Sequence, residues 1–433
     1  MKKLSKILVF ALVVACFLQL PAFAYTPLDT QVSAPRAAVY SIDADRFVYE
    51  KNATQECSIA SVTKIVTSMV VIEKVGDLQQ QVTITQEMID LIPFDSSTAG
   101  LAVGEVYTYE QLLYCLMVPS GNDAAIALAV AVSGSLDAFS GEMNRFVASL
   151  GCENTGFVNP HGIDELGQYS TAADLVKILK YCIQNEQFMQ FFSTYKYELS
   201  IEGYSDTLEH TNKMMDPEGE YYYQYIIGSK TGTDTGAGSC LISLAQKDGL
   251  KYITVVLGCE RPHEVWGPYT YSDTKALFED AFSSYAVCTV NKPGEIIGAL
   301  PVTYMKDGEE VELTVVDSLT AVCDKGMTAD NFTHEIDVVG EYIAPLAAGT
   351  VVGNVKYYDE NGEYVGSSEL VTVQGAEYSK FEAIMASLSL VSGWQYLLLL
   401  IGAIFVALFI MFIIQSIKRS IRRAKRRKQG KHR

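Results

Sequence analysis

Histidine and closely spaced cysteine, the usual zinc ligands, are scarce in this sequence. It has 5 histidines in 433 residues, and its 9 cysteines include no C-x-x-C pair. Structural zinc sites need four Cys or His ligands at short, characteristic spacings. We therefore expect no metal ion, and the sequence indicates no other cofactor.

Excess positive charge is also absent from most of the chain. The formal net charge is −18, although residues 1–24 hold three lysines and residues 418–433 hold ten Lys or Arg without an acid, so residues 25–417 carry a net −31. A surface of this sign repels nucleic-acid phosphates. We expect no nucleic-acid partner and interpret the acidic surface as a solvated one.

The N-terminal end indicates export. Three lysines precede the apolar residues 7–20, and an A-F-A cleavage site ends at residue 24. We predict a signal peptide at 1–24; lipidation at Cys16 is the weaker alternative, because the apolar stretch continues past that cysteine. The eight other cysteines permit disulfides in an exported chain, with the pairing left open.

The C-terminal end indicates a membrane anchor. Tyr396–Ile414 contains no charged residue, and as a helix it spans about 28 Å, close to the hydrocarbon thickness of a bilayer. We predict a transmembrane helix at 394–415, which makes this a single-pass protein of the cell membrane. The basic tail, 416–433, then lies in the cytoplasm and the bulk of the chain outside; a nucleic-acid-binding arm is the rival interpretation of the tail.

Between these ends the sequence pattern predicts two domains. After a linker at 25–34, residues 35–289 are typical of an α/β layered domain. Glycine-punctuated β-branched runs at 290–376 indicate a small all-β domain, and 377–393 is an amphipathic connector. The elements expected in the first domain are a hairpin from Ala37, helices at Ser61–Lys74, Tyr109–Met117, Ala124–Val132, Thr171–Gln184 and Thr274–Tyr285, and strands at Tyr223–Ile227 and Tyr252–Gly258.

Three short motifs carry the candidate chemistry. Two of them occur once, Ser120-Gly121-Asn122 and Lys230-Thr231-Gly232, whereas Ser-x-x-Lys occurs three times, at Ser61/Lys64, Ser193/Lys196 and Ser272/Lys275. Only the first of these pairs precedes both other motifs. Each motif alone is a weak indication, but in this order the trio is the known signature of penicillin-binding proteins and serine β-lactamases.

The first motif suits a serine nucleophile and its base. Residues three apart share a helix face, so Lys64 Nζ can reach Ser61 Oγ. A serine in the first turn also lies at the positive end of the helix dipole, which stabilises an alkoxide. The lysine must be neutral to accept a proton, and burial beside a second cation, Lys230, would lower its pKa. Taken alone, Ser61 would be an ordinary helix cap; the other motifs reverse that interpretation.

The second motif would act on the leaving group. We expect Ser120 to relay a proton to the leaving amine and Asn122 to hold Lys64 and the substrate amide, with Gly121 supporting their turn. The alternative is that these are ordinary cap and turn residues.

The third motif would bind substrate. Lys230 and Thr231 suit a terminal carboxylate, and Gly232 would let a substrate strand lie close to the sheet edge. The backbone N–H groups of Ser61 and Thr233 would form an oxyanion hole.

The segments around the motifs resemble one family. A-S-V-T-K-I-V-T, L-M-V-P-S-G-N-D-A-A, N-P-H-G-I-D, G-Q-Y-S-T-A-A-D-L and G-S-K-T-G-T follow the order found in low-molecular-mass penicillin-binding proteins, the serine-type D-alanyl-D-alanine carboxypeptidases. The resemblance implies a five-stranded antiparallel sheet flanked by helices, then a β-rich domain. It also implies release of the terminal D-alanine from peptidoglycan pentapeptide stems through a Ser61 acyl-enzyme, and acylation of the same serine by β-lactams. The third residue of the stem stays open.

The resemblance also assigns residues outside the trio. Asp174 matches a family acid that we interpret as supporting site geometry. His161 matches too, and we favour a structural turn residue over a catalytic one. Arg261 is the candidate for the arginine that helps hold the substrate carboxylate in the family, although it comes earlier in the sequence than expected.

Other functions with the same acylation chemistry compete with the carboxypeptidase. A β-lactamase needs rapid deacylation, but the Glu-x-x-Leu-Asn element of the commonest class is absent. An endopeptidase that cuts cross-links remains an alternative. A penicillin-sensing receptor is less favoured, because the short tail has no room for a signalling domain.

Overall fold

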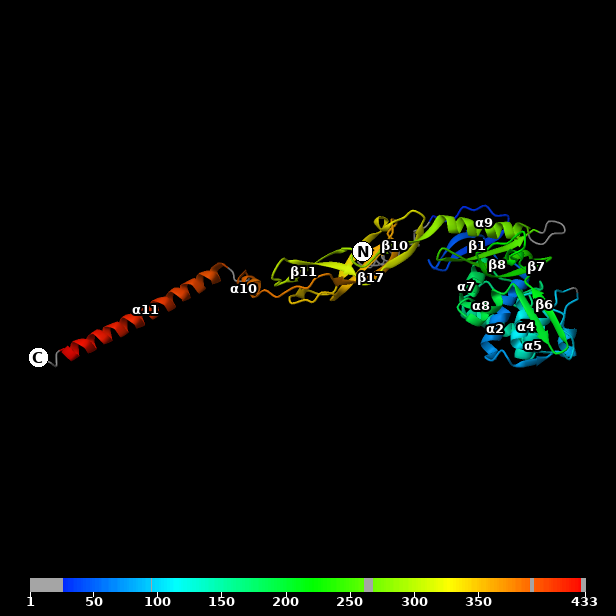
Figure 1. The fold of residues 1–433 in the computed structure, drawn as a ribbon, viewed down its shortest axis with the longest axis horizontal. Coiled ribbons are helices and arrows are strands. Elements are labelled where there is room, and N and C mark those ends of the chain that lie inside the picture. The colour runs from blue at the N-terminus through cyan, green and yellow to red at the C-terminus, as the bar shows by residue number, and fades with distance from the viewer. Residues whose placement is uncertain (1–25, 95, 261–267, 390–392, 430–433) are drawn as a thin grey trace, which may run out of the picture. The chain divides into compact units, whose positions relative to one another are not determined.

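The computed structural model describes residues 26–94, 96–260, 268–389 and 393–429. The predicted signal peptide and Arg261 therefore lie outside the described residues. The chain forms two compact units (Figure 1); the first runs to Val290 and also includes Thr320–Thr333 and Tyr357–Gly366.

The first unit alternates strands with a block of helices. Its elements up to residue 192 are β1 (Arg36–Ser41), β2 (Arg46–Lys51), the 3-10 helix η1 (Ala60–Thr63), α2 (Lys64–Val75), β3 (Gln81–Thr83), α3 (Gln86–Asp90), β4 (Val106–Thr108), α4 (Tyr109–Met117), α5 (Asn122–Ser133), α6 (Leu136–Ser149), α7 (Ala172–Cys182) and α8 (Glu186–Phe192). Then follow β5 (Lys196–Ile201), β6 (Tyr204–Glu209), η2 (Lys213–Met215), β7 (Ile226–Asp234), β8 (Gly238–Lys247), β9 (Leu250–Cys259), α9 (Pro268–Ser284) and β10 (Tyr285–Asn291).

A five-stranded sheet lies at the centre of this unit. Its order is β2-β1-β9-β8-β7, and every neighbouring pair is antiparallel. Successive residues of a strand point to opposite faces, so Leu241 and Val256 join one buried cluster with α9, whereas Ile242 and Val255 join another with α2, α4, α5 and α7. Figure 1 shows α9 on one side of the sheet and the helix block on the other. The predicted antiparallel sheet flanked by helices is confirmed.

Side-chain caps fix where most of the helices begin. Thr108 forms a capping box with Gln111 at the start of α4, and Thr171 caps α7 through the N–H of Asp174. Such caps satisfy backbone donors that have no partner inside the helix. The start of α2 has no side-chain cap and is preceded by the 3-10 turn of η1.

Several of the local predictions agree with the structure. The hairpin from Ala37, the helix at Tyr109–Met117 and the strand within Leu250–Cys259 are confirmed. The strand expected from Tyr223 begins only at Ile226; the Tyr223 ring is buried and stacks on Phe278. The prediction missed α6, α8 and β8 among others.

The remaining strands follow α9. They are β11 (Gly298–Thr303), β12 (Glu310–Val315), β13 (Leu319–Asp324), β14 (Thr333–Val338), β15 (Tyr342–Ile343), β16 (Val351–Tyr358) and β17 (Tyr364–Thr372), with the short η3 (Ala329–Asn331) after β13. Six of them form one sheet in the order β14-β16-β17-β12-β11-β15, which confirms the small β domain. β10 pairs with β13, and a disulfide joins Cys288 to Cys323.

Two helices end the described chain, α10 (Lys380–Ser389) and α11 (Gly393–Gln429). Within the described ranges, α11 alone is a single helix long and apolar enough to cross a membrane, over Gly393–Arg423. The helix continues past the predicted boundary at residue 415 into the basic tail.

Candidate active site

The amine of Lys64 lies at the centre of the site. The side chain is fully buried in the first turn of α2. Its Nζ lies 2.7 Å from Ser61 Oγ, 2.6 Å from Asn122 Oδ1 and 2.9 Å from the carbonyl oxygen of His161. A neutral amine has two N–H donors and one lone pair. The two carbonyl oxygens take both donors, which leaves the lone pair for the Ser61 hydroxyl.

Burial favours this neutral form. Removal from water lowers the pKa of Lys64 well below its usual value, and the nearby Lys230 lowers it further, whereas Asp123 opposes the shift. An ammonium without a carboxylate partner is costly to bury, so the proton leaves instead. The amine is thereby suited to accept a proton from Ser61.

The Ser120-Gly121-Asn122 turn joins α4 to α5. Ser120 has φ = 66°, a left-handed conformation that is rare for a residue with a side chain. Strain of this kind is held by surrounding structure and is common at functional sites. A Cβ on Gly121 would lie 2.6 Å from Asp123 Oδ1 and 2.9 Å from the Cys115 carbonyl oxygen, so this tight turn requires glycine.

Strand β7 brings the third motif to the same place. Lys230 is fully buried, and its Nζ donates to Ser120 Oγ at 2.8 Å and to the carbonyl of Thr231 at 2.9 Å. Burial lowers the pKa of Lys230 to about 7. The three predicted motifs, far apart in sequence, are thus linked through Lys64–Asn122 and Lys230–Ser120.

Because Gly232 has no side chain, β7 can lie close to η1. The space where a side chain would lie is therefore not open. A Cβ at Gly232 would lie 2.6 Å from the Ile59 carbonyl oxygen and 3.1 Å from Ser61 N. The backbone after Gly232 therefore runs beside the N–H of Ser61, where an oxyanion hole with Thr233 N–H is expected. The expected contact between Gly232 and a substrate strand stays a prediction.

His161 contributes its backbone to the site. Its carbonyl accepts from Lys64, while its ring Nδ1 accepts from the N–H of Ile163 at 3.2 Å. Burial, together with the nearby Lys64, lowers the pKa of His161 to about 3, so the ring is neutral. Gly162, with φ = 93°, passes so close to the Ala60 carbonyl that a Cβ would lie 2.0 Å from its oxygen. These contacts favour the structural role expected for His161.

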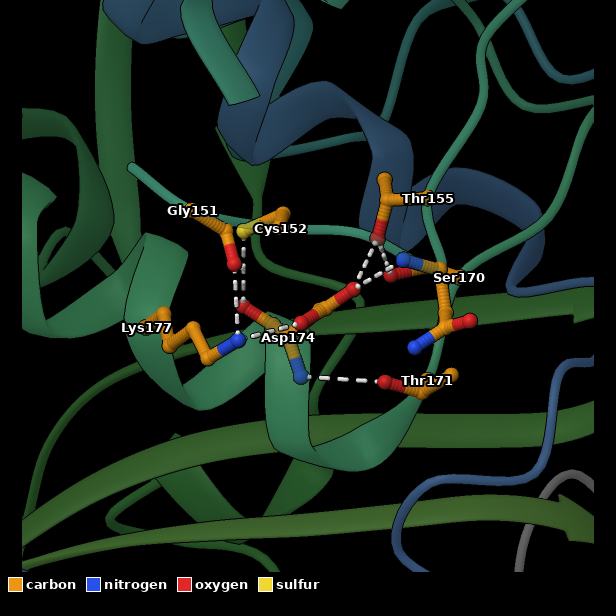
Figure 2. Close-up of polar contacts among 8 residues, drawn as sticks. Gly151, Cys152, Thr155, Ser170, Thr171, Asp174 and Lys177 are labelled. Atoms are coloured by element: carbon orange, nitrogen blue, oxygen red, sulfur yellow. Dashed lines mark hydrogen bonds and ion pairs between the residues drawn. The ribbon is translucent and has the colours of Figure 1, made fainter. Parts of the chain in front are cut away.

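Asp174 forms a separate polar cluster (Figure 2). Its carboxylate accepts from Asn154 N–H and Thr155 Oγ1, both at 3.0 Å, and pairs with Lys177 at 2.9 Å. Thr155 Oγ1 in turn lies 2.9 Å from Ser170 Oγ. None of the contacts found for Asp174 reaches Ser61, Lys64 or Lys230, so its supporting role stays a prediction.

The other two Ser-x-x-Lys pairs do not form comparable sites. Ser193 and Lys196 are exposed; Ser193 donates to the Met189 carbonyl at 2.7 Å, and Lys196 pairs with Glu209 at 3.0 Å. Ser272 and Lys275 are exposed on α9. Both pairs match the motif by chance.

Several residues that support the site were not predicted from the sequence. Asp123 accepts from the N–H groups of Ala99, Gly100 and Leu101, at 2.9, 2.9 and 3.0 Å, and so fixes the loop before β4 onto the start of α5. Thr211 Oγ1 is hydrogen-bonded to Thr231 Oγ1. The segment D-A-A after Ser120-Gly121-Asn122 could have indicated Asp123 as a buried cap, but no spacing rule relates Thr211 to β7.

His210 supports β7 from behind. It is buried, its Nδ1 accepts from Asn212 N–H at 2.9 Å, and its Nε2 lies 3.2 Å from the Ser229 carbonyl oxygen. His210 therefore carries its proton on Nε2 and donates it to the Ser229 carbonyl oxygen of β7. Burial and the nearby Lys230 lower the pKa of His210 to about 3, so this contact is made by a neutral ring.

The arrangement is suited to acyl transfer. It combines a hydroxyl with a neutral amine, a second lysine close to a second hydroxyl, and adjacent backbone N–H donors. Within the described ranges, no three His, Cys, Asp or Glu side chains gather closely enough to hold a metal ion.

Comparison with known proteins identifies similar sequences over both predicted domains. Residues 23–261 match the family described as D-alanyl-D-alanine carboxypeptidase, and residues 287–377 match the C-terminal domain of penicillin-binding protein 5. D-alanyl-D-alanine carboxypeptidase DacF of Bacillus subtilis (strain 168) is 27% identical over 355 residues, which cover 80% of this chain and 87% of that protein. D-alanyl-D-alanine carboxypeptidase of Streptomyces sp. (strain K15) is 35% identical over 224 residues, covering 48% of this chain and 75% of that protein.

Solved structures show the same similarity. Penicillin-binding protein 5 from Haemophilus influenzae aligns with a TM-score of 0.60 at 25% identity, covering 81% of this chain and 100% of that one. The Streptomyces K15 DD-transpeptidase aligns with a TM-score of 0.54 at 31% identity, covering 59% of this chain and 99% of that one.

Proposed function

Because this chain belongs to the D-alanyl-D-alanine carboxypeptidase family, a family of serine hydrolases, we propose that it removes the terminal D-alanine of peptidoglycan stem peptides through an acyl-enzyme at Ser61. The observation that carries this assignment is the Lys64 amine, buried with two carbonyl acceptors and 2.7 Å from Ser61 Oγ. β-Lactams acylate the same serine.

Acylation begins with the proton of Ser61. The hydroxyl gives its proton to neutral Lys64 as Oγ attacks the carbonyl carbon of the penultimate D-alanine. The N–H groups of Ser61 and Thr233 stabilise the oxyanion that forms there. This position of the donors is supported by the close approach of Gly232 to Ser61 N.

The leaving amine takes up a proton as the C–N bond breaks. Ser120 can deliver it and receive in turn the proton that Lys64 took from Ser61, which leaves Lys64 neutral again. The Ser120 hydroxyl contacts Lys230, and its neighbour Asn122 contacts Lys64. The free D-alanine departs and water then attacks the ester at Ser61, with Lys64 again as the base. The ammonium of Lys230 and the hydroxyl of Thr231 hold the substrate carboxylate in this scheme, and Arg261 stays a candidate for the same task.

A paired assay tests the function directly. The purified full chain in detergent should release D-alanine from diacetyl-Lys-D-Ala-D-Ala and should form a slowly hydrolysed adduct with penicillin. This is expected because the chain has a family match to carboxypeptidases and no Glu-x-x-Leu-Asn element for deacylation. Rapid penicillin turnover with no D-alanine release would instead establish a β-lactamase, and cleavage of cross-linked dimers alone would establish an endopeptidase.

The pH dependence of turnover should report both lysines. Activity should fall at low pH as Lys64 becomes protonated and loses its lone pair, and fall at high pH as Lys230 loses its charge. A bound carboxylate raises the pKa of Lys230 above its value of about 7 in the free enzyme. The alkaline limb of kcat should therefore lie at higher pH than that of kcat/KM, since these report the bound and the free enzyme.

A peptide amidated at its C-terminus is the control for this shift. It has no carboxylate to interact with Lys230, so its two alkaline limbs should coincide. Coincident limbs for the natural carboxylate substrate would refute the contact with Lys230.

The same proposal includes orientation. α11 is apolar enough to cross a membrane, and the ten basic residues within 418–433 favour a cytoplasmic tail with the catalytic domain outside. Labelling of intact cells with a membrane-impermeant fluorescent penicillin tests this orientation.

A further inference from the structure

A cavity of about 730 Å³ opens beside the candidate active site. Among the described residues, its walls come from the start of β1, the segment before η1, the turn between β7 and β8, and the end of β9; they include Arg36, Ser58, Asp234, Gly238 and Glu260. None of the three motifs contributes a residue to it.

The cavity lies where the N-terminal part of a bound stem peptide would run. Ser58 is three residues before the nucleophile, and Asp234 is two residues after Gly232. With the substrate carboxylate at Lys230 and Thr231 and its scissile carbonyl near Thr233, the preceding residues extend toward Asp234 and the β7–β8 turn. At about 3.3 Å per residue in an extended chain, the third stem residue reaches this turn.

The charges in the cavity include Arg36, whose Nε has no hydrogen-bond partner among the described residues. Arg36 Nε is buried and has no hydrogen-bond partner, and no ion pair to Arg36 is found among the described residues. Its Nη1 lies beside Gly258: a Cβ added to Gly258 would be 3.4 Å from this nitrogen. Arg36 lines the cavity, so a carboxylate that entered it would gain a charge-assisted hydrogen bond from the terminal nitrogens of the guanidinium.

The two acidic residues of the cavity differ. Asp234 is already occupied, because its carboxylate accepts from the N–H groups of Asp164 and Gly236, both at 3.2 Å. Glu260 is exposed and, within the described ranges, forms no ion pair or hydrogen bond with its side chain. Within the part of the chain that the structure describes, the cavity thus offers one available cation, Arg36, and one available anion, Glu260.

We propose that this cavity binds the third residue of the stem peptide and prefers a side chain that ends in both a carboxylate and an ammonium over one that ends in an ammonium alone. The carboxylate contacts Arg36 and the ammonium contacts Glu260. This inference rests on the proposed carboxypeptidase function and specifies the substrate of the same site.

The test compares two pentapeptides that differ only at the third residue. L-Ala-γ-D-Glu-X-D-Ala-D-Ala is prepared with X as meso-diaminopimelate or L-lysine, and D-alanine release by the full chain in detergent gives kcat/KM for each. The wild type should prefer the diaminopimelate peptide. Arg36→Gln should lower kcat/KM for that peptide about tenfold, the size of one charge-assisted hydrogen bond, and should leave the lysine peptide nearly unchanged.

Two further variants and one further peptide sharpen the comparison. Arg36→Glu should reverse the preference in favour of lysine, because it places a carboxylate where the guanidinium was. Arg145→Gln removes a surface arginine of α6 that pairs with Glu142 and should change neither rate. A diaminopimelate peptide with its side-chain carboxylate converted to an amide should react like the lysine peptide. Labelling by fluorescent penicillin checks that each variant is folded.

The possible outcomes distinguish a wrong assignment of the cavity from a wrong assignment of the function. An equal loss on both peptides, or no loss on either, in folded Arg36→Gln would overturn the assignment of the cavity alone. No D-alanine release by the wild type from any of the peptides would overturn the carboxypeptidase function and the cavity assignment with it.

Discussion

Ser61→Ala is expected to abolish both D-alanine release and covalent labelling by penicillin. The substitution removes the only atom proposed to form the acyl bond, so the rate should fall by at least about 10⁴-fold, as for other serine hydrolases that lose their nucleophile. D-Alanine release is measured with the purified chain, and labelling is followed on gels and on intact cells with a membrane-impermeant fluorescent penicillin.

The two chance copies of the motif provide matched controls. Ser193→Ala and Ser272→Ala remove hydroxyls that are exposed and donate to backbone carbonyls of their own helices, at 2.7 and 3.0 Å. Both variants should be labelled and should release D-alanine like the wild type. Labelling that persists in Ser61→Ala but disappears in one of these two would place the nucleophile there.

Lys64→Arg is expected to have the second largest effect, a loss of acylation by roughly 10²–10⁴-fold, the usual contribution of a general base. The substitution keeps a positive side chain but removes every neutral amine, because guanidinium does not deprotonate in proteins. It also places a larger group in a fully buried position between Ser61, Asn122 and His161. The second-order rate constant for penicillin acylation, measured by stopped-flow or gel labelling, gives the size of the loss.

A lysine on the same helix is the control for this exchange. Lys74 is half-exposed at the end of α2 and pairs with Glu142 at 2.9 Å, a contact that arginine can also make. Lys74→Arg should acylate normally. A folded Lys64→Arg variant that acylates at the wild-type rate would rule out proton transfer to this amine and would require another base.

Folding stability separates loss of chemistry from loss of structure in Lys64→Arg. A charged guanidinium at a fully buried position has no carboxylate partner among the contacts of Lys64, so the free energy of unfolding should fall. The unfolding midpoint in denaturant should therefore be recorded for each variant. Only those with a cooperative transition count toward the kinetic comparison.

The predictions that succeeded rested on patterns within short stretches of the sequence. The helix face shared by Ser61 and Lys64 follows from a spacing of three residues, and the uncharged run in α11 follows from length and hydropathy. Each of these properties depends on neighbours within a few turns, which a linear sequence displays. The antiparallel sheet, by contrast, was expected from family resemblance and not from spacing.

Contacts between distant segments required the folded chain. Nothing local places the carbonyl of His161 on the Lys64 amine, or Thr211 beside Thr231, because those pairs are 97 and 20 residues apart. Gly232 shows the same limit. The sequence indicates a position without a side chain, but only the folded structure shows that the backbone around η1 occupies the space where a side chain would lie.

The order of the three motifs and the apolar run of α11 can therefore be recognised in the sequence, and that order selects Ser61 over Ser193 and Ser272 as the predicted nucleophile. The protonation state of the base was decided by three-dimensional packing, since it depends on how completely folding excludes water from Lys64 and how near it brings Lys230. The cavity at Arg36 also depends on three-dimensional packing, because its walls come from four separate segments that meet only when the sheet has formed.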